Sequence, residues 1–423
     1  MKIEGKQMID QMDIILNGDE AVAYAVKQSD VDVVAAYPIT PQTIIVERLA
    51  EFLANGEADY EFISVESEHS ALSAVMGASA AGARAFTATA SQGLLLMNEI
   101  LWIVSSLRLP VVMAIVDRAV SAPINIHCDH TDIMSARDTS WVILHAENAQ
   151  EAYDTVIQAF RIAEDERVLL PVMVGFDGFL VSHTSERIKI FKDDEIVHKF
   201  LGGPRKIPKI ELQGKTTDFA LWPKTPVPIT LGPLDLYDYY FEHKIPQAIA
   251  MENAYQVIKE VHDEYAKISG RSYGDGLLHP YMVDDAEIIA IVMGSTAGTM
   301  RYVIDEMREE GLKVGMVRIR SFRPFPYKQL AEMIKHAKII GVFDRAQDMG
   351  AQGGPLYVET RSTLYDYDLR PKVVNYVYGL GGRDTPPSLL RGALDKLYDI
   401  LKGKEKIFRR IYLGVRGPEV RGE

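Results

Sequence analysis

Short apolar runs alternate with longer amphipathic segments through most of the 423-residue chain, and this alternation limits the fold more than any other feature. Runs of this length, bounded by glycine, proline or polar residues, are typical of buried strands. Strands that alternate with helices form parallel sheets covered by helices, so an α/β fold is expected. The expected strands lie at 32–37, 61–65, 85–90, 111–116, 141–144 and 170–174, and then at 288–293, 313–319, 339–343 and 372–377.

The two series of strands predict two α/β domains. Between them lies a connector rich in proline, glycine and lysine, at about residues 202–245, followed by a helix expected at 246–268. The connector is too long for an ordinary loop and is expected to lie over a surface. We place a larger domain at residues 1–280, including this connector and helix, and a smaller domain at residues 281–423.

Composition and charge exclude several classes of function. The net charge of −13 argues against nucleic acid and an anionic membrane surface as partners, because both need clustered Lys and Arg. No apolar run reaches the length of about 18 residues that a membrane span requires. The N-terminal residues lack the order of a signal peptide. With Cys128 as its single cysteine, the chain is expected to be a cytoplasmic protein without disulfides.

One glutamate stands directly before a segment built almost entirely of small residues. Glu68 precedes residues 69–83, which are mostly Ala, Ser and Gly and include Gly77. Small side chains allow close backbone approach, and a carboxylate in a first helical turn is favoured by the helix dipole. An acid at the start of a packed helix is the simpler interpretation. Glu66 is the rival for any special role.

A stiff turn follows the first expected strand. Residues 37–41 read Tyr-Pro-Ile-Thr-Pro, and the two prolines, Pro38 and Pro41, each fix φ. Loops at the carboxyl ends of parallel strands are where ligands bind in such sheets. The alternative is a rigid strand–helix connection without a ligand.

Five motifs follow one another along the chain. They are the YPITP turn, the segment that begins at Glu68, TATASQGLLLM at 87–97, the Asp117-Arg118-Ala119 turn and GLGGRD at 379–384. Together they resemble the α-type subunit of the pyruvate and branched-chain 2-oxoacid:ferredoxin oxidoreductases, over roughly residues 17–384. The resemblance implies a pyrimidine-type thiamine-diphosphate-binding parallel-sheet domain followed by a smaller transketolase C-terminal-like α/β domain. It also implies oxidative decarboxylation of pyruvate with coenzyme A to acetyl-CoA and carbon dioxide, with electrons passing to ferredoxin.

The resemblance assigns roles to individual residues. Glu68 is expected to bond N1′ of the aminopyrimidine, which favours the imino tautomer that deprotonates the thiazolium ring. Thr40 is expected to face the keto and carboxylate groups of the 2-oxoacid. Arg118 is expected to bind that carboxylate with its planar fork of donors, although a surface salt bridge with Asp117 is the simpler reading. Cofactor contacts are expected from Pro38, Ile39, Ser91, Gln92 and Gly93, of which the last three also fit a helix cap.

The chain carries only half of a thiamine-diphosphate site. Gly274-Asp275-Gly276 looks like the start of the family's metal motif, but no Asn follows at the required distance, so a polar turn explains it better. This implies a β subunit that holds the diphosphate and Mg²⁺. One cysteine cannot hold a cluster that needs about four thiolates, so the [4Fe-4S] clusters are expected on ferredoxin-like γ and δ subunits.

Two further segments carry polar groups. Residues 126–132 bring together His127, Cys128 and His130, but adjacent side chains diverge and the spacing suits no common metal site, so no metal ligand is expected. The resemblance suggests a loop near the active site, with Arg137 and Asp138 in an internal ion pair. The loop at 293–298 has the geometry of a helix-N-terminus anion site.

Several alternatives stay open. The branched-chain (2-oxoisovalerate) enzyme shares the same chemistry, and the sequence shows no residue that sets acyl size. The β-type subunit of a 2-oxoacid dehydrogenase uses a glutamate in the same way, but the YPITP turn and GLGGRD argue against this alternative. Thr40 argues against an oxalate-oxidising relative, which has arginine there. A scaffold subunit with a degenerate site is the non-enzyme alternative.

Overall fold

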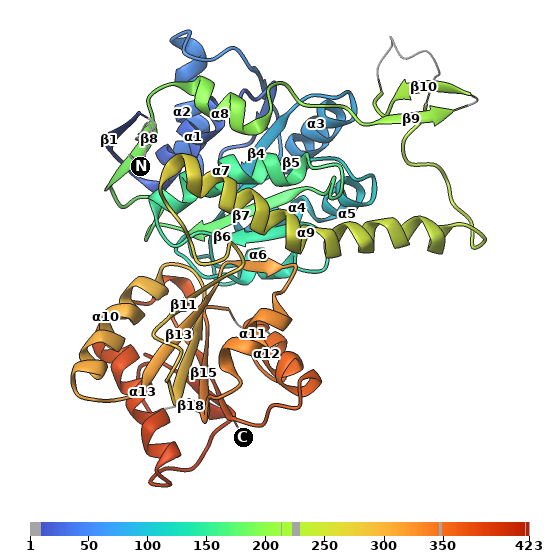
Figure 1. Ribbon diagram of the computed structural model, residues 1–423. Helices are drawn as coiled ribbons and strands as arrows, with labels where there is room; N and C mark the ends of the chain where they lie inside the picture. The colour runs from blue at the N-terminus through green and yellow to red at the C-terminus, as the bar shows by residue number, and fades with distance from the viewer. Residues whose placement is uncertain (1–9, 213, 222–228, 347–348, 419, 423) are drawn as a thin grey trace, which may run out of the picture.

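The computed structural model describes residues 10–212, 214–221, 229–346, 349–418 and 420–422, and its core is formed by two seven-stranded sheets (Figure 1). The strand order of the first sheet is β14-β6-β7-β5-β4-β2-β3. All neighbours are parallel except β14, which pairs antiparallel with β6. The strands are β2 (Val33–Ala36), β3 (Glu61–Ser64), β4 (Ala85–Thr89), β5 (Val111–Asp117), β6 (Val142–His145), β7 (Val172–Asp177) and β14 (Ser321–Arg323).

Helices cover both faces of this sheet, which leaves β4, β5, β6 and β7 buried along their whole length. Burial on both faces is why these strands are continuous apolar runs and not alternating patterns. The helices are α1 (Gly18–Gln28), α2 (Thr43–Ala54), α3 (Glu68–Ala80), α4 (Ser91–Leu96), α5 (Asn98–Ser106), α6 (Thr131–Ser135), α7 (Ala149–Ala163) and α8 (Asp194–Leu201). A small antiparallel pair, β1 (Gln11–Leu16) with β8 (Glu186–Phe191), lies beside them.

The second sheet has the order β11-β13-β12-β15-β16-β17-β18, with antiparallel pairs at its two ends and parallel pairs between. The strands of this second sheet are β11 (Leu278–Tyr281), β12 (Ile288–Val292), β13 (Val314–Ile319), β15 (Ile339–Asp344), β16 (Lys372–Val377), β17 (Arg410–Tyr412) and β18 (Val420–Gly422). Its helices are α10 (Thr296–Glu309), α11 (Tyr327–Ile334), α12 (Pro355–Asp366) and α13 (Pro387–Leu401). Together the two sheets confirm the predicted α/β class.

The connector and the following helix differ from the prediction. Two short strands, β9 (Lys209–Leu212) and β10 (Lys215–Asp218), form an antiparallel pair within the connector. The helix, α9 (Tyr240–Ser269), begins six residues before the predicted start. The prediction placed its start at Pro246, which in the structure lies inside the helix. A proline usually marks the first turn of a helix, since its missing N–H removes an interior hydrogen bond. Part of α9 extends away from the rest of the fold (Figure 1).

Two other boundaries could not be read from local pattern. The helical region after β4 is divided into α4 and α5 at Met97. The edge strand β14 belongs by sequence to the expected second domain, yet it completes the first sheet. The expected boundary at 280/281 falls inside β11, and the domain division stays a prediction. In the described residues, no helix is long and apolar enough to span a bilayer.

A buried ion cluster joins the two sheets. Glu151 on α7 accepts hydrogen bonds from Arg318 Nη2 at 2.8 Å and from Arg320 Nε at 3.0 Å, and all three side chains are buried. Burial alone raises the pKa of Glu151, but the two arginines outweigh burial and lower that pKa to about 2. The carboxylate is therefore charged at neutral pH and ties β13 and the residues after it to the first sheet.

Removing this charge tests the cluster. Glu151→Gln is expected to lower the free energy of unfolding by about 3–5 kcal/mol, because it leaves the buried Arg320 without its carboxylate and Arg318 with only Glu147, at 3.4 Å. Since the pKa is lowered from 4.5 to about 2 in the folded chain, the contribution is complete above pH 4.5 and is lost as the pH falls toward 2. Urea unfolding of both proteins between pH 7 and 3 measures it.

The matched control is Glu260→Gln, which breaks an exposed ion pair with Arg167 and is expected to change stability by less than about 1 kcal/mol. Equal unfolding midpoints for Glu151→Gln and the unchanged protein would contradict the cluster's role.

Candidate active site

The predicted site residues lie on loops and first helical turns at the carboxyl ends of neighbouring parallel strands. The loop after β2 carries residues 37–42, and Glu68 begins α3 after β3. Ser91–Gly93 begin α4 after β4, whereas Arg118 follows β5 directly. Since β3, β2, β4 and β5 are adjacent and parallel, these loops open at one edge of the sheet. That edge is the usual ligand-binding position in open α/β sheets.

Glu68 is the first residue of α3, and Ser67 caps this helix by accepting a hydrogen bond from Ser70 N at 3.2 Å. The Glu68 side chain is 8% exposed. Within the described residues, no protein group donates a hydrogen bond to its carboxylate. Its rival, Glu66, is exposed and accepts a hydrogen bond from the Ser70 hydroxyl. The Glu68 carboxylate oxygens are not fully enclosed, and without a protein donor they have free capacity for a ligand at the edge of the site.

The loop after β4 packs directly against Glu68. A Cβ at Gly93 would lie 2.7 Å from Glu68 Oε1 and 2.3 Å from Thr89 Oγ1, so only glycine leaves room for both groups. The Thr89 hydroxyl is itself buried without a partner. Ser91 and Gly93 are buried, and Gln92 is partly exposed. The structure thus brings Glu68 together with the segment 91–93, from which cofactor contacts were expected.

The stiff turn is held by Gln42, for which no role could be predicted. Gln42 is fully buried; its Oε1 accepts from Ile39 N at 3.1 Å and its Nε2 donates to Ala88 O at 2.9 Å. These bonds fasten the turn to β4. Pro38 and Thr40 are exposed at the edge of the site, and Ile39 is partly exposed.

Arg118 lies across this turn and not in a surface ion pair. Its side chain is 6% exposed, with Nη1 donating to Thr40 O at 2.9 Å and Nε to Asn125 O at 3.1 Å. Asp117 pairs instead with His145. The simpler reading of Arg118 as a salt-bridge partner of Asp117 is therefore wrong. Two carbonyl oxygens fix the guanidinium and leave its Nη2 without an acceptor among the described residues.

Asp132 fixes the backbone of two site loops at once. Its Oδ2 accepts from Ser91 N at 2.8 Å and from Arg118 N at 2.9 Å, and its Oδ1 accepts from Ile133 N at 2.8 Å. Ser91 has a positive φ of 44°, a conformation that needs such support. In the sequence, Asp132 stands only at the end of a segment whose spacing suits no common metal site. Its position in a first helical turn is too common a feature to reveal this role.

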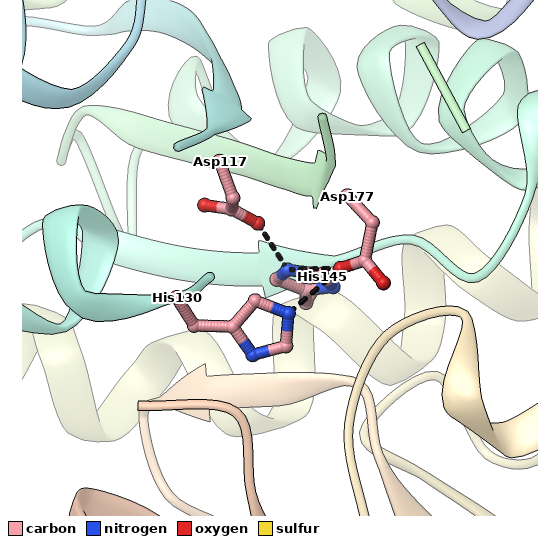
Figure 2. A group of neighbouring side chains, drawn as sticks. All are labelled: Asp117, His130, His145 and Asp177. Atoms are coloured by element: carbon pink, nitrogen blue, oxygen red, sulfur yellow. Dashed lines mark hydrogen bonds and ion pairs between the residues drawn. The ribbon is translucent and has the colours of Figure 1, made fainter. Parts of the chain in front are cut away.

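A second buried cluster, shown in Figure 2, lies where the carboxyl edges of the two sheets meet. His130 Nε2 is 2.7 Å from Asp177 Oδ1, and His145 Nε2 is 2.5 Å from Asp117 Oδ2. Asp177 Oδ2 also accepts from Arg345 Nη1 at 2.7 Å and from the backbone and hydroxyl of Ser295. This cluster could not be found from the sequence, because its members lie far apart in the chain.

The charges of this cluster favour its present hydrogen bonds. Burial alone would raise the pKa of Asp177, but the charges of His130 and Arg345 hold that pKa well below its usual range. Burial raises the pKa of Asp117 and lowers that of His145. Two imidazoles and two carboxylates whose donor atoms lie within 4.8 Å are a donor set that suits zinc. The 2.5 Å between His145 and Asp117 and the 2.7 Å between His130 and Asp177 are hydrogen-bond lengths. The charge of Asp177 is already balanced by Arg345.

Other predictions on loops can also be judged. The loop at 293–298 does bind an anion at the start of α10, and that anion is the chain's own Asp177. Asp275 accepts from Leu277 N and Leu278 N, so Gly274–Gly276 is a polar turn as predicted. Cys128 is buried.

The ion pair expected between Arg137 and Asp138 is present, with Arg137 Nε 4.0 Å from Asp138 Oδ2. It is not enclosed, because the Asp138 side chain is 71% exposed. The two residues follow Ala136, the C-cap of the short helix α6.

Comparisons with known proteins show which proteins this chain is similar to. Residues 24–263 match the thiamine-diphosphate-binding domain of pyruvate flavodoxin/ferredoxin oxidoreductases, and residues 286–390 match core domain II of pyruvate:ferredoxin oxidoreductase. The chain is 50% identical to the pyruvate synthase subunit PorA of Thermotoga maritima over 405 residues, which cover 95% of this chain and 98% of that protein. It is 43% identical to the ketoisovalerate oxidoreductase subunit VorA of Pyrococcus abyssi over 388 residues, 92% of this chain and 94% of that one.

The fold also matches a solved structure of 2-oxoglutarate:ferredoxin oxidoreductase from Magnetococcus marinus, with a TM-score of 0.70 and 19% identity, over 91% of this chain. The match spans 65% of that longer chain, somewhat less than two thirds. On the sequence matches, this chain belongs to the pyruvate flavodoxin/ferredoxin oxidoreductase family.

Proposed function

We propose that this chain is the α subunit of a thiamine-diphosphate-dependent 2-oxoacid:ferredoxin oxidoreductase that converts pyruvate and coenzyme A to acetyl-CoA and carbon dioxide. The buried Glu68 carboxylate, which has no donor among the described residues and faces Gly93, is the observation that carries this proposal. The electrons pass to ferredoxin. The relatives named pyruvate synthase subunits support pyruvate as the substrate.

The residues present fit the aminopyrimidine half of thiamine diphosphate. Glu68 offers an unpaired acceptor for the N1′ proton, and the missing side chain of Gly93 keeps the loop after β4 close to that carboxylate. Pro38, Ile39 and the segment Ser91–Gly93 line the same edge. When bound, thiamine diphosphate supplies the carbon nucleophile that adds to the keto carbon of the 2-oxoacid.

Arg118 and Thr40 are proposed to hold the 2-oxoacid. Arg118 is fixed by two carbonyl oxygens through Nη1 and Nε, so its Nη2 is left to meet a substrate carboxylate. Charge-assisted bonds of this kind are about twice as strong as neutral ones. Thr40 lies at the exposed end of the turn whose carbonyl anchors Arg118, where its hydroxyl is available to the keto oxygen.

The missing parts of the site are proposed to come from partner subunits. Four apolar side chains are exposed on α4 and α5, which pack against α3, the helix that begins at Glu68: Leu95, Leu96, Trp102 and Ile103. An exposed apolar patch marks a protein contact, and here it fits a β subunit that brings the diphosphate and Mg²⁺ half of the site. The [4Fe-4S] clusters are placed on ferredoxin-like γ and δ subunits, since Cys128 is the chain's single cysteine and is buried.

The ketoisovalerate enzyme is the second candidate, because the VorA relatives are 43–45% identical to this chain. Rates of the purified complex with pyruvate, 2-oxoisovalerate and 2-oxoglutarate distinguish the candidates. A higher kcat/KM for 2-oxoisovalerate than for pyruvate would replace the first proposal by the second.

Glu68→Gln tests the carboxylate. The amide keeps the shape but cannot take the N1′ proton, so turnover of the assembled complex is expected to fall by a factor of about 10² or more. Glu66→Gln, which changes an exposed neighbour, is expected to keep nearly full activity. Equal kcat values for the two variants would refute the assignment of Glu68.

Gly93→Ala tests the contact between Glu68 and the loop after β4. The added methyl group would lie 2.7 Å from Glu68 Oε1, and it is expected to displace the carboxylate and weaken thiamine diphosphate binding at least about tenfold. Gly77→Ala adds the same methyl group where nothing lies within 4 Å, and calorimetric titration should find its affinity unchanged. Unchanged affinity in Gly93→Ala would show that this contact does not position Glu68.

The half-site proposal predicts a difference between the isolated chain and the complex. Without the subunit that holds the diphosphate, thiamine diphosphate with Mg²⁺ is expected to bind the isolated chain at least about a hundredfold more weakly, a difference of ~3 kcal/mol. Titration calorimetry on both preparations measures it. Comparable dissociation constants would mean that this chain holds the whole cofactor.

A further inference from the structure

A glycine-rich turn of the second sheet contacts the loop that follows Arg118. The turn, residues 379–382, leaves the carboxyl end of β16, and three hydrogen bonds join it to the loop. Asn125 Nδ2 donates to Gly381 O at 3.0 Å, Gly381 N donates to Asp129 Oδ2 at 3.1 Å, and Gly382 N donates to Cys128 O at 2.7 Å. This turn contains the GLGG of the sequence motif, to which no role has been assigned so far.

The turn needs glycine for two separate reasons. Gly381 and Gly382 have φ values of 58° and 75°, which side chains other than glycine adopt only with strain. A Cβ at Gly381 would also lie 2.5 Å from Asn125 Nδ2, and one at Gly382 would lie 2.4 Å from His127 Cβ. The backbone of the turn is thus pressed against the loop, and any side chain would push the loop away.

The same loop residue holds the guanidinium of Arg118. The carbonyl oxygen of Asn125 accepts from Arg118 Nε at 3.1 Å, while its side chain donates to Gly381. Its Oδ1 also accepts from His127 N at 2.7 Å, which closes the loop locally. Asn125 therefore links the second domain's turn to Arg118 through a single residue.

We propose that the turn at residues 379–382 is a positioning element for the 2-oxoacid, which acts by holding Asn125 and through it the guanidinium of Arg118. The proposal rests on the substrate role proposed above for Arg118. It gives the second domain a part in substrate specificity: the turn sets where the guanidinium meets the carboxylate, without touching the substrate itself. A shift of the turn would change carboxylate affinity before it changed the chemical step.

Two substitutions that change no charge test the positioning role of the turn in the assembled complex. Gly381→Ala removes the close approach, and Asn125→Ala removes the side-chain bond to the turn. Each is expected to raise the KM for pyruvate about fivefold or more, the effect of losing one hydrogen bond. The kcat and the KM for coenzyme A are expected to stay within about twofold. A general structural defect would instead lower kcat and affect both substrates.

Gly403→Ala is the matched control, because Gly403 also has a positive φ of 73° in the second domain but nothing lies within 4 Å of its Cβ position. It is expected to leave the KM for pyruvate unchanged. In an Arg118→Ala background, Gly381→Ala and Asn125→Ala are expected to add no further rise, since residues that act through one group are not additive.

The outcomes separate the two proposals. If Arg118→Ala raises the KM for pyruvate while Gly381→Ala and Asn125→Ala both leave it within twofold, the positioning role of the turn is overturned and the role of Arg118 stands. If Arg118→Ala itself leaves that KM unchanged, the proposed function of Arg118 fails, and the role of the turn fails with it.

Discussion

The buried carboxylate of Asp177 is the contact on which the arrangement of the site depends. It ends β7 at the carboxyl edge of the first sheet and accepts hydrogen bonds from Ser295 and Arg345, which follow strands β12 and β15 of the second sheet. Burying this charge is costly unless it is fully paired. The pairing therefore turns the carboxyl edges of both sheets toward each other.

That arrangement lets the second sheet take part in a site built on the first. The backbone of His130 donates to Arg345 O at 2.8 Å, two residues from Asp132, which holds the backbones of Ser91 and Arg118. The turn at 379–382 approaches from the end of β16. The loop between Arg118 and Asp132 is thus held from both sheets, whereas the Glu68 carboxylate is left without a donor in the described part of the chain. A rigid frame around an unsatisfied acceptor is what a preorganised cofactor site requires.

Sequence reasoning succeeded where a property is local. The buried strands were predictable because burial on both faces demands unbroken apolar runs. Glu68, Thr40 and Arg118 were proposed from ordered motifs, and their roles stay predictions. Sequence reasoning failed where a residue's role depends on distant partners. Asp132, Gln42 and Asp177 look ordinary in sequence, because their hydrogen-bond partners lie elsewhere in the chain. The pairing of β14 with the first sheet and the continuation of α9 through Pro246 likewise depend on packing, which the local sequence pattern does not encode.

The central claim is that the Glu68 carboxylate is reserved for a ring nitrogen of a cofactor completed by another subunit. The most direct measurement is a structure of the assembled complex with thiamine diphosphate bound. Our account predicts Glu68 Oε1 or Oε2 within hydrogen-bond distance of N1′, about 2.6–3.2 Å, with the diphosphate held by the neighbouring subunit. A Glu68 side chain turned away from the pyrimidine, or a pyrimidine ring bound elsewhere, would contradict it.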